Sequence, residues 1–496
     1  MTNSAENILN GSFYFNSANV LSVNQTPLND LVQKFLSNDE IDFSKGVFME
    51  EGNKLVPFKS QLTTPLYVYS KKRLLTNFLN YKKSFQREIT HKFGIDTNIS
   101  YSIKANFNPS ILKLFHQNGC WASLVNKNEL LLAQKIGIKG ENLIFNGNGK
   151  KLIEIELAIK NKCFLNIDSW FNLNDTIKIA KKLRQNESLK SCFPVRLLLR
   201  INQNENANVH QYLNTSGDEC KFGIRDDQID ELINIIKAND FVQLSGFHSH
   251  LGSTIKTLDI YNECVKNLIQ LINSTIEKHN IETIELINFG GGLGINYEKF
   301  ASRTSMSSKP EIEFPTPSDL AKVIAAHVTK LKNLNVKIVV EPGRSLVGDS
   351  CILLTKLLGL KKNGNKNFLV VDSSMCECIR PCLYSAYHHI EYLEPLSSTN
   401  ELFDIVGPVC ESGDFLGKDR LLQIPKNLND NHVYLAIMDV GAYCSSMALN
   451  YNIHTKPAEV FIEEIHDTNE KITKNEYFLT RNPESLEDVM ACFTEF

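Results

Sequence analysis

One lysine of this chain stands where chemistry fits better than packing. Lys104 ends the short apolar run 98–104 ("NISYSIK"), just before a segment of helical period. From this position its amine could attack an aldehyde and form a Schiff base. The ordinary alternative is a strand-end lysine that extends its charge into solvent. The choice depends on which other groups the fold brings to the same place.

A run of glycines could bind a phosphate group. The segment 288–294 ("NFGGGLG") offers successive peptide N–H groups without side chains, and such groups can surround a phosphate near a helix start. A tight turn is the alternative explanation of the run. A lysine beside a phosphate site is the arrangement expected for pyridoxal phosphate, whose aldehyde binds a lysine amine covalently.

Glu341 supplies the acid that this hypothesis needs. A carboxylate that faces the pyridine nitrogen keeps the ring protonated and makes it a strong acceptor for an electron pair. The alternative is an ion pair with Arg344, three residues further along the chain.

The elements that must position these groups alternate regularly between about residues 95 and 341. Helical-period segments separate eight apolar runs without clean polar alternation, as expected for parallel strands covered on both faces. Two of these segments place apolar residues on one face, namely Ile229, Leu232, Ile233 and Ile236, and Val265, Leu268, Ile269 and Ile272. Eight β/α units in about 250 residues predict an α/β fold with a TIM-type (β/α)8 barrel. The eight runs are 98–104, 120–125, 142–146, 163–168, 195–201, 242–250, 284–290 and 336–342.

Polar residues and glycines follow these predicted strands. In such barrels the catalytic groups lie at the carboxyl ends of the strands, so we expect these residues at one rim. Surface turns would also place polar residues there, so the joint pattern carries the argument. The residues concerned are Lys104, Asn146, Gly147, Asp168, Arg200, His248, His250, the glycine run and Glu341.

The sequence predicts three parts. Residues 1–62 form an N-terminal segment that partly joins a β domain and contains an irregular insertion at about 18–60. Residues 63–341 form the barrel that binds pyridoxal phosphate. Residues 342–496 contain short β-favouring runs broken by Gly, Asn and Pro, which predict a C-terminal β domain.

Composition narrows the class of partner. The chain has 496 residues and a net charge of −3, so it offers no broad basic surface for nucleic acid. No apolar run approaches the roughly 20 residues that span a bilayer. Twelve cysteines and a first basic residue at Lys34 indicate reduced thiols and no signal or transit peptide. We therefore expect a cytoplasmic protein with a small-molecule partner, and neither nucleic acid nor membrane.

Ten motifs together resemble a known family. They match, in order from about residue 63 to the C-terminus, the pyridoxal phosphate-dependent decarboxylases of alanine-racemase-like fold, and within them the diaminopimelate decarboxylases. That fold is a TIM-type barrel plus a C-terminal β domain. The motifs are "TPLYVYS", "YSIKAN", "NGNGK", "LNIDSW", "HSHLGS", "NFGGGLGINY", "EPGRSLVG", "IRPCLYSAYH", "GPVCESGD" and "GAYCSSMALNYN".

The resemblance implies a role for each cofactor-binding residue. Lys104 would carry the cofactor and His250 would stack on its ring. Glu341 would meet the pyridine nitrogen, where racemases of this fold usually present an arginine, so the glutamate favours decarboxylation. The phosphate would be held by Ser253, Gly290, Gly291 and Gly292.

The same resemblance implies how the substrate is held. Arg344, Arg380 and Tyr384 would bind the carboxylate at the far end of meso-diaminopimelate, and Glu411 would pair with the ammonium there. Charge-assisted arginine–carboxylate contacts are strong and selective, and ornithine and lysine lack that carboxylate. The products would be L-lysine and carbon dioxide, in the last step of lysine biosynthesis.

Two further residues would act during and after loss of carbon dioxide. Cys410 would return a proton to the carbanion, and Tyr443 would contact both cofactor and substrate. In the family, the segment around Cys410, Glu411 and Ser412 reaches the site of the partner subunit, which predicts a homodimer with shared active sites. An ordinary buried thiol is the alternative for Cys410.

Other interpretations stay open. Related substrates are ornithine, arginine and carboxynorspermidine, and some relatives of this fold are non-catalytic regulators. The segment 126–130 ("NKNEL") and Cys444 depart from the family pattern near the expected pocket rim. The segment 375–382 ("MCECIRPC") with His388 and His389 invites a zinc interpretation, but it lacks a paired C-x-x-C spacing, so no metal is expected.

Overall fold

The computed structural model describes most of the chain in eleven stretches. These are residues 13–23, 26–28, 47–51, 54–57, 62–203, 220–305, 313–332, 335–396, 398–425, 433–467 and 472–494. Within them, no helix is both long and apolar enough to cross a membrane. The chain divides into two compact units. Unit 1 comprises Met1–Asn77, Asn296–Glu313 and Leu346–Phe496, and unit 2 comprises Phe78–Ile295 and Phe314–Ser345.

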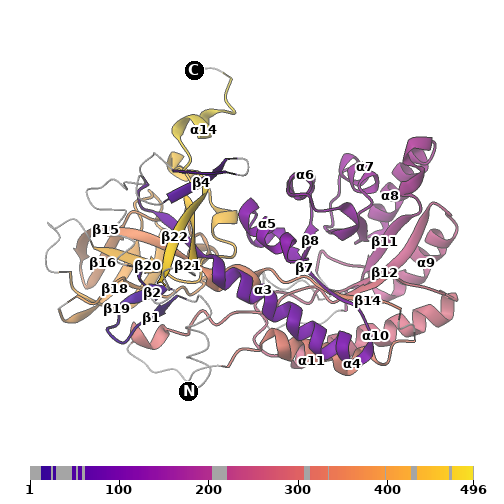
Figure 1. Cartoon of the computed structure of the whole chain (residues 1–496), viewed down its shortest axis with the longest axis horizontal. Helices are drawn as coiled ribbons and strands as arrows, with labels where there is room; N and C mark the ends of the chain where they lie inside the picture. Colours follow the sequence, from indigo (N-terminus) through magenta and orange to yellow (C-terminus); the bar gives the residue numbers. More distant parts are fainter. Residues whose placement is uncertain are drawn as a thin grey trace. The chain divides into compact units, whose positions relative to one another are not determined.

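Unit 2 is built on a closed barrel of parallel strands (Figure 1). All eight predicted runs form its strands, and β14 closes the barrel by pairing with β7, with Val340 opposite Ile99. The predicted (β/α)8 architecture is therefore confirmed. The strands are β7 (Thr97–Ser102), β8 (Trp121–Leu124), β9 (Leu143–Phe145), β10 (Phe164–Ile167), β11 (Val195–Arg200), β12 (Val242–His248), β13 (Leu286–Asn288) and β14 (Lys337–Val340).

Helices connect the barrel strands. The apolar faces predicted for α9 and α10 are buried, so they pack inward as their period indicated. Helix α3 (Lys71–Phe85) starts in unit 1 and ends in unit 2. The other helices of unit 2 are α4 (His91–Phe93), α5 (Pro109–Gln117), α6 (Lys127–Ile136), α7 (Leu152–Lys160), α8 (Trp170–Leu183), α9 (Asp226–Lys237), α10 (Asp259–His279) and α11 (Pro317–Val328).

Side chains fill the lower part of the barrel. A buried cluster joins five of the eight barrel strands, β9, β10, β11, β13 and β14, through Ile144, Phe164, Leu198, Leu286 and Val339. The barrel is thus a packed core rather than a channel, and polar groups are left to its carboxyl rim.

Unit 1 is built on a large mixed sheet. Its long strand β15 (Cys351–Asn363) pairs with β6, β16 and β20, and a buried apolar cluster that includes Val68, Ile352 and Val460 lies on this sheet. The other strands are β4 (Val47–Glu51), β5 (Lys54–Pro57), β6 (Leu66–Ser70), β16 (Lys366–Val371), β17 (Ile390–Tyr392), β18 (Asn400–Val406), β19 (Phe415–Gln423), β20 (Tyr434–Ile437), β21 (Glu459–Asp467) and β22 (Ile472–Arg481).

N-terminal residues contribute strands to unit 1. A small sheet contains β1 (Tyr14–Phe15), β2 (Leu21–Val23) and β3 (Thr26–Pro27), and β4 pairs with β22 of the large sheet. Three short helices, α12 (Arg344–Val347), α13 (Arg380–Tyr384) and α14 (Leu486–Met490), complete the described α-helices. The division at residues 62 and 341 stays a prediction.

Candidate active site

The predicted site residues fall into two sets, one on each unit. The barrel carries Lys104, His250, Ser253, Gly290, Gly291, Gly292, Glu341 and Arg344, and unit 1 carries Arg380, Tyr384, Cys410, Glu411 and Tyr443.

Glu341 is held rigidly at the rim of the barrel. It directly follows β14 and is only 7% exposed. Three donors converge on its Oε1 atom, namely Ser123 Oγ at 2.7 Å, Asn288 Nδ2 at 2.8 Å and Asn146 Nδ2 at 2.9 Å. These donors come from or just beyond β8, β13 and β9, so the barrel itself orients the carboxylate. The ion pair with Arg344, considered as an alternative, is replaced by this network.

A buried histidine faces the other oxygen of the carboxylate. His248 Nε2 lies 3.5 Å from Glu341 Oε2. Burial lowers the pKa of His248 well below its ordinary value, and the charges of Arg200, Lys104 and Lys150 lower it further, so the ring is neutral. Asn166 Nδ2 donates to His248 Nδ1, which leaves the ring proton on Nε2, toward Glu341.

Lys104 lies over the same rim. It stands in the short 3₁₀ turn Ile103–Ala105 that follows β7, and its side chain is exposed. Burial lowers the pKa of both His248 and His250 well below the ordinary value, and the charge of Lys104 lowers both further.

The glycine loop is locked against Glu341 and His250. Gly290 has φ +65°, and a Cβ atom on Gly291 would lie 2.2 Å from the backbone oxygen of Glu341. The N–H of Gly290 donates to Asn288 Oδ1 at 2.9 Å, and that of Gly291 donates to His250 Nδ1 at 3.1 Å. Two of the three N–H groups predicted to bind phosphate therefore donate within the protein. The glycines here permit close approach of backbones.

Ser253 and Arg344 contact each other on unit 2. Arg344 is 4% exposed, and its Nη2 donates to Ser253 Oγ at 3.1 Å. The family resemblance assigns the serine to phosphate and the arginine to the substrate carboxylate. A hydroxyl next to a buried guanidinium suits an anion in either case.

The remaining rim residues hold the network together. Asp168 and Arg200 form a buried ion pair at 3.4 Å. The amine of Lys150 donates to the backbone oxygens of Gly147 and Asn166, each at 2.6 Å.

On unit 1, Arg380 is a buried cation poised for an anion. It begins α13, is 4% exposed, and donates from Nη1 to His388 Nε2 at 2.7 Å. Its guanidinium carbon lies 4.8 Å from the centre of the Tyr297 ring. It forms no ion pair with any residue that the structure describes. Tyr384, at the end of the same helix, is half-buried.

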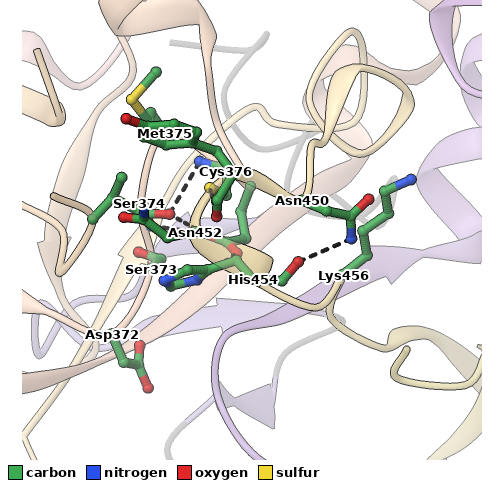
Figure 2. A network of polar contacts seen from close by, with 12 residues as sticks. Asp372, Ser373, Ser374, Met375, Cys376, Asn450, Asn452, His454 and Lys456 are labelled. Carbon is green, nitrogen blue, oxygen red and sulfur yellow. Dashed lines mark hydrogen bonds and ion pairs between the residues drawn. The ribbon is translucent and has the colours of Figure 1, made fainter. Parts of the chain in front are cut away.

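Cys410 and Glu411 lie on an exposed loop with a rigid base. Residues 410–413 are all exposed, whereas Asp414 is buried and accepts hydrogen bonds from the N–H groups of Met375 and Val409. The N–H of Cys410 donates to Asn452 Oδ1 at 2.9 Å. Figure 2 labels Met375 and Asn452, whose contacts with Asp414 and Cys410 hold the base of the loop.

Tyr443 has an unusual backbone. Its φ is +59°, which is costly for a residue with a Cβ atom and is concentrated at functional sites. The side chain is half-buried, and the neighbouring residues Ala442 and Cys444 are fully buried.

Comparison with known proteins assigns the family. The model of the pyridoxal binding domain of pyridoxal-dependent decarboxylases matches residues 79–348. The probable chloroplastic diaminopimelate decarboxylase of Oryza sativa is 39% identical over 81% of this chain and 75% of its own length. The enzyme of Aquifex aeolicus is 34% identical over 86% of this chain and 93% of its own. The chain belongs to the diaminopimelate decarboxylase family.

Solved structures of the family agree with this fold. The Helicobacter pylori diaminopimelate decarboxylase complexed with L-lysine has a TM-score of 0.73 at 32% identity, covering 86% of this chain and 96% of that one. The Methanocaldococcus jannaschii enzyme has a TM-score of 0.79 at 28% identity, covering 98% of both chains. The barrel with an added β domain is thus the fold of the diaminopimelate decarboxylases.

The barrel set fits pyridoxal phosphate, the cofactor of this family. The chain provides a lysine at the rim, a fixed buried carboxylate and a loop in which added Cβ atoms would collide with neighbouring backbone. Three hydrogen bonds to Oε1 hold the orientation of Glu341.

Sequence reasoning missed some of the supporting residues. Ser123 and Asn166 lie on β8 and β10 and were not singled out, although both serve the Glu341 network. Their only signal in the sequence is that each is a polar residue within an otherwise apolar run. A buried barrel strand normally has an apolar side chain at such a position.

Proposed function

We propose that the protein removes one carboxyl group from meso-diaminopimelate and releases L-lysine and carbon dioxide, the last step of lysine biosynthesis. The single observation that carries this proposal is the buried Glu341 carboxylate, held by three donors at the barrel rim of a diaminopimelate decarboxylase chain. Solved relatives complexed with L-lysine support lysine as the product.

The site residues on the barrel bind the cofactor and support its chemistry. When bound, pyridoxal phosphate takes up the electron pair left as the carboxyl group departs. Glu341 keeps a negative charge beside the pyridine nitrogen, and the fixed orientation of its carboxylate means that no reorganisation is needed during the reaction. Lys104 holds the cofactor and exchanges protons from its amine at the rim.

The phosphate is held by Ser253 and the glycine loop. Because the N–H groups of Gly290 and Gly291 already donate to Asn288 and His250, we assign phosphate binding chiefly to the N–H of Gly292 and the Ser253 hydroxyl. Gly290 and Gly291 contribute by letting the loop approach closely. His250 stays neutral because burial lowers its pKa well below the ordinary value, which suits a ring that stacks on the cofactor.

Arginines select the substrate. Arg344, Arg380 and Tyr384 bind the carboxylate at the far end of diaminopimelate, and Glu411 pairs with the ammonium there. The burial of both guanidinium groups supports this assignment, because a buried cation gains most from a bidentate anion. Ornithine and lysine lack the second carboxylate that these cations would bind.

The exposed loop supplies the proton. Cys410 returns a proton to the carbon that has lost its carboxyl group, and Tyr443 contacts cofactor and substrate. Exposure of residues 410–413 on a rigid base supports a loop that extends into the active site of a partner subunit. The active form is therefore a homodimer.

The same proposal places the protein in the cytoplasm. All twelve cysteines are free thiols, which fits a reducing compartment.

Carbon dioxide release tests the proposal. Purified protein with pyridoxal phosphate is given meso-diaminopimelate, ornithine, arginine or lysine, with Lys104→Ala as control. Release from meso-diaminopimelate alone, absent in the control, is expected. Release from ornithine or arginine instead would retain the decarboxylation but contradict the roles of Arg344, Arg380 and Glu411. No release from any substrate would favour a non-catalytic regulator.

A further inference from the structure

We propose that three buried side chains of unit 1, Cys378, His388 and Cys444, form a binding site for a thiophilic cation such as Zn²⁺. One ligand atom from each residue lies within 4.8 Å of the other two. All three side chains are almost fully buried, at 0%, 0% and 1% exposure. The three residues come from before α13, after α13 and beyond β20, so the fold brings them together from separate segments.

The two sulfur atoms already have the spacing of a metal site. Cys378 Sγ and Cys444 Sγ are 3.7 Å apart. Tetrahedral zinc with Zn–S bonds of about 2.3 Å places two sulfur ligands about 3.8 Å apart. A cation therefore fits between the thiols with little movement of either chain segment.

The histidine is oriented as a metal ligand usually is. His388 Nδ1 lies 2.8 Å from the backbone oxygen of Met438, which can only accept, so Nδ1 carries the proton. Such a contact fixes the ring and leaves the lone pair of Nε2 for a metal. In this structure Nε2 accepts from Arg380 Nη1. The cation would take the place of that donor.

Charge also permits binding beside Arg380. As the two Zn–S bonds form, both thiols release their protons to solvent, and two thiolates balance the charge of one Zn²⁺. The site is then neutral, and the guanidinium of Arg380 can donate to a thiolate sulfur in place of the imidazole. Because protons are released, zinc binding is expected to tighten as pH rises.

The remaining members of the cysteine-rich segment have other partners. Cys376 Sγ donates to the backbone oxygen of Tyr451 at 3.5 Å, and Cys382 Sγ donates to that of Phe415 at 3.4 Å. His389 pairs with Glu391 at 2.8 Å. The spacing of "MCECIRPC" gave no metal motif because the third ligand, Cys444, lies far along the chain. Figure 2 shows Cys376 within its own hydrogen-bonded turn.

Occupancy of the site should weaken substrate binding. This consequence rests on the proposed function, in which Arg380 binds the far carboxylate of the substrate. A cation at His388 removes the contact that positions Arg380. We therefore expect zinc to raise the KM for meso-diaminopimelate more than it lowers kcat.

Zinc content and zinc spectroscopy test the site without reference to activity. The reduced, cofactor-loaded protein is dialysed against Zn²⁺, and its metal content and X-ray absorption spectrum are measured. We expect one zinc ion per chain with two sulfur ligands. Wild-type protein that retains no zinc, or retains it without sulfur ligands, would refute the proposal.

Matched variants locate the ion. Cys378→Ser and Cys444→Ala should each lose the bound zinc, whereas Cys376→Ser, two residues from Cys378 but bonded elsewhere, should keep it. Retention in both of the first two variants, or loss in all three, would place the ion at another site and overturn the proposal. If a variant fails to fold, the X-ray absorption spectrum of the wild-type protein still tests the proposal, because it shows whether two sulfur atoms bind the zinc.

Discussion

At the scale of single residues, the orientation of Glu341 is the most informative detail of the barrel rim. Its Oε1 atom receives three hydrogen bonds, while Oε2 faces the neutral ring of His248. Hydrogen bonds of this kind fix the direction of a carboxylate, which suits the proposed place of Glu341 beside the pyridine nitrogen.

Glu341→Gln should separate binding of the cofactor from catalysis. Glutamine keeps an oxygen for the donors of Ser123, Asn146 and Asn288 but removes the charge. We expect kcat to fall at least about 100-fold, because a preorganised electrostatic group is lost, with the cofactor absorbance retained. Stopped assays of carbon dioxide release measure the effect.

A matched control for this prediction is Glu88→Gln. Glu88 is also a buried glutamate of unit 2, but it pairs with Arg87 and Lys92 on the outer helices. Its substitution should leave kcat nearly unchanged. Equal kcat in Glu341→Gln and wild type would show that the carboxylate does not serve the ring nitrogen.

The sequence indicated the proposed reacting residues better than the residues that support them. Lys104 and Glu341 end predicted strands, where function is expected, and unusual residue types made them visible. Ser123 and Asn166 lie within strands, and no pattern along the chain distinguishes a polar side chain turned into the barrel from one turned outward. Their roles required the distances to Glu341 and His248.

At the scale of elements, one lysine joins three neighbouring parts of the barrel. The amine of Lys150 donates to Gly147 after β9, to Asn166 on β10 and to Asn172 on α8. Asn166 in turn donates to Asn146 and His248, the two residues beside Glu341. Lys150 is therefore a positioning residue that acts through the elements which carry the network.

Lys150 should make barrel stability depend on pH. Burial lowers the pKa of its amine to about 7, compared with about 10.4 in an unfolded chain. Between these values the unfolded chain binds more protons than the folded one, so the free energy of unfolding should rise with pH, by up to about 1.4 kcal/mol per unit. Below about pH 7 both states are protonated, and this contribution stays constant.

Urea unfolding of wild type and Lys150→Met from about pH 6 to about pH 9 measures this effect. Both tryptophans, Trp121 on β8 and Trp170 on α8, lie in unit 2, so their fluorescence reports on the barrel. The difference between wild type and variant should grow with pH. Lys160→Met, which removes an exposed lysine paired with Glu156, is the control and should track wild type. Parallel curves for Lys150→Met and wild type would contradict the shifted pKa.

The elements themselves differ in how far the sequence predicts them. All eight barrel strands were foreseen, because parallel strands covered on both faces are short, apolar and regularly spaced. The large sheet of unit 1 was foreseen only as a β domain. Its neighbours are remote in sequence, since β6 pairs with both β15 and β21, and pairing over such separations leaves no local pattern.

At the scale of the whole molecule, the proposed dimer gives the exposed loop 410–413 its purpose. A thiol that transfers protons must reach the substrate, yet Cys410 is exposed and its loop is fixed at the base by Asp414 and Asn452. A rigid, exposed loop suits insertion into another copy of the chain, because it loses little freedom on binding.

Mixing two inactive variants tests this arrangement directly. Lys104→Ala and Cys410→Ala should each inactivate the protein. If the two residues of a site come from different chains, a dimer with one chain of each kind has both substitutions at one site and none at the other. Random assembly then restores about a quarter of the wild-type activity. If both residues of a site came from one chain, every site in the mixture would carry a substitution and no activity would return. Light scattering on the same mixture shows whether dimers are present, and the separately prepared variants are the controls. A dimeric mixture without activity would exclude the shared site.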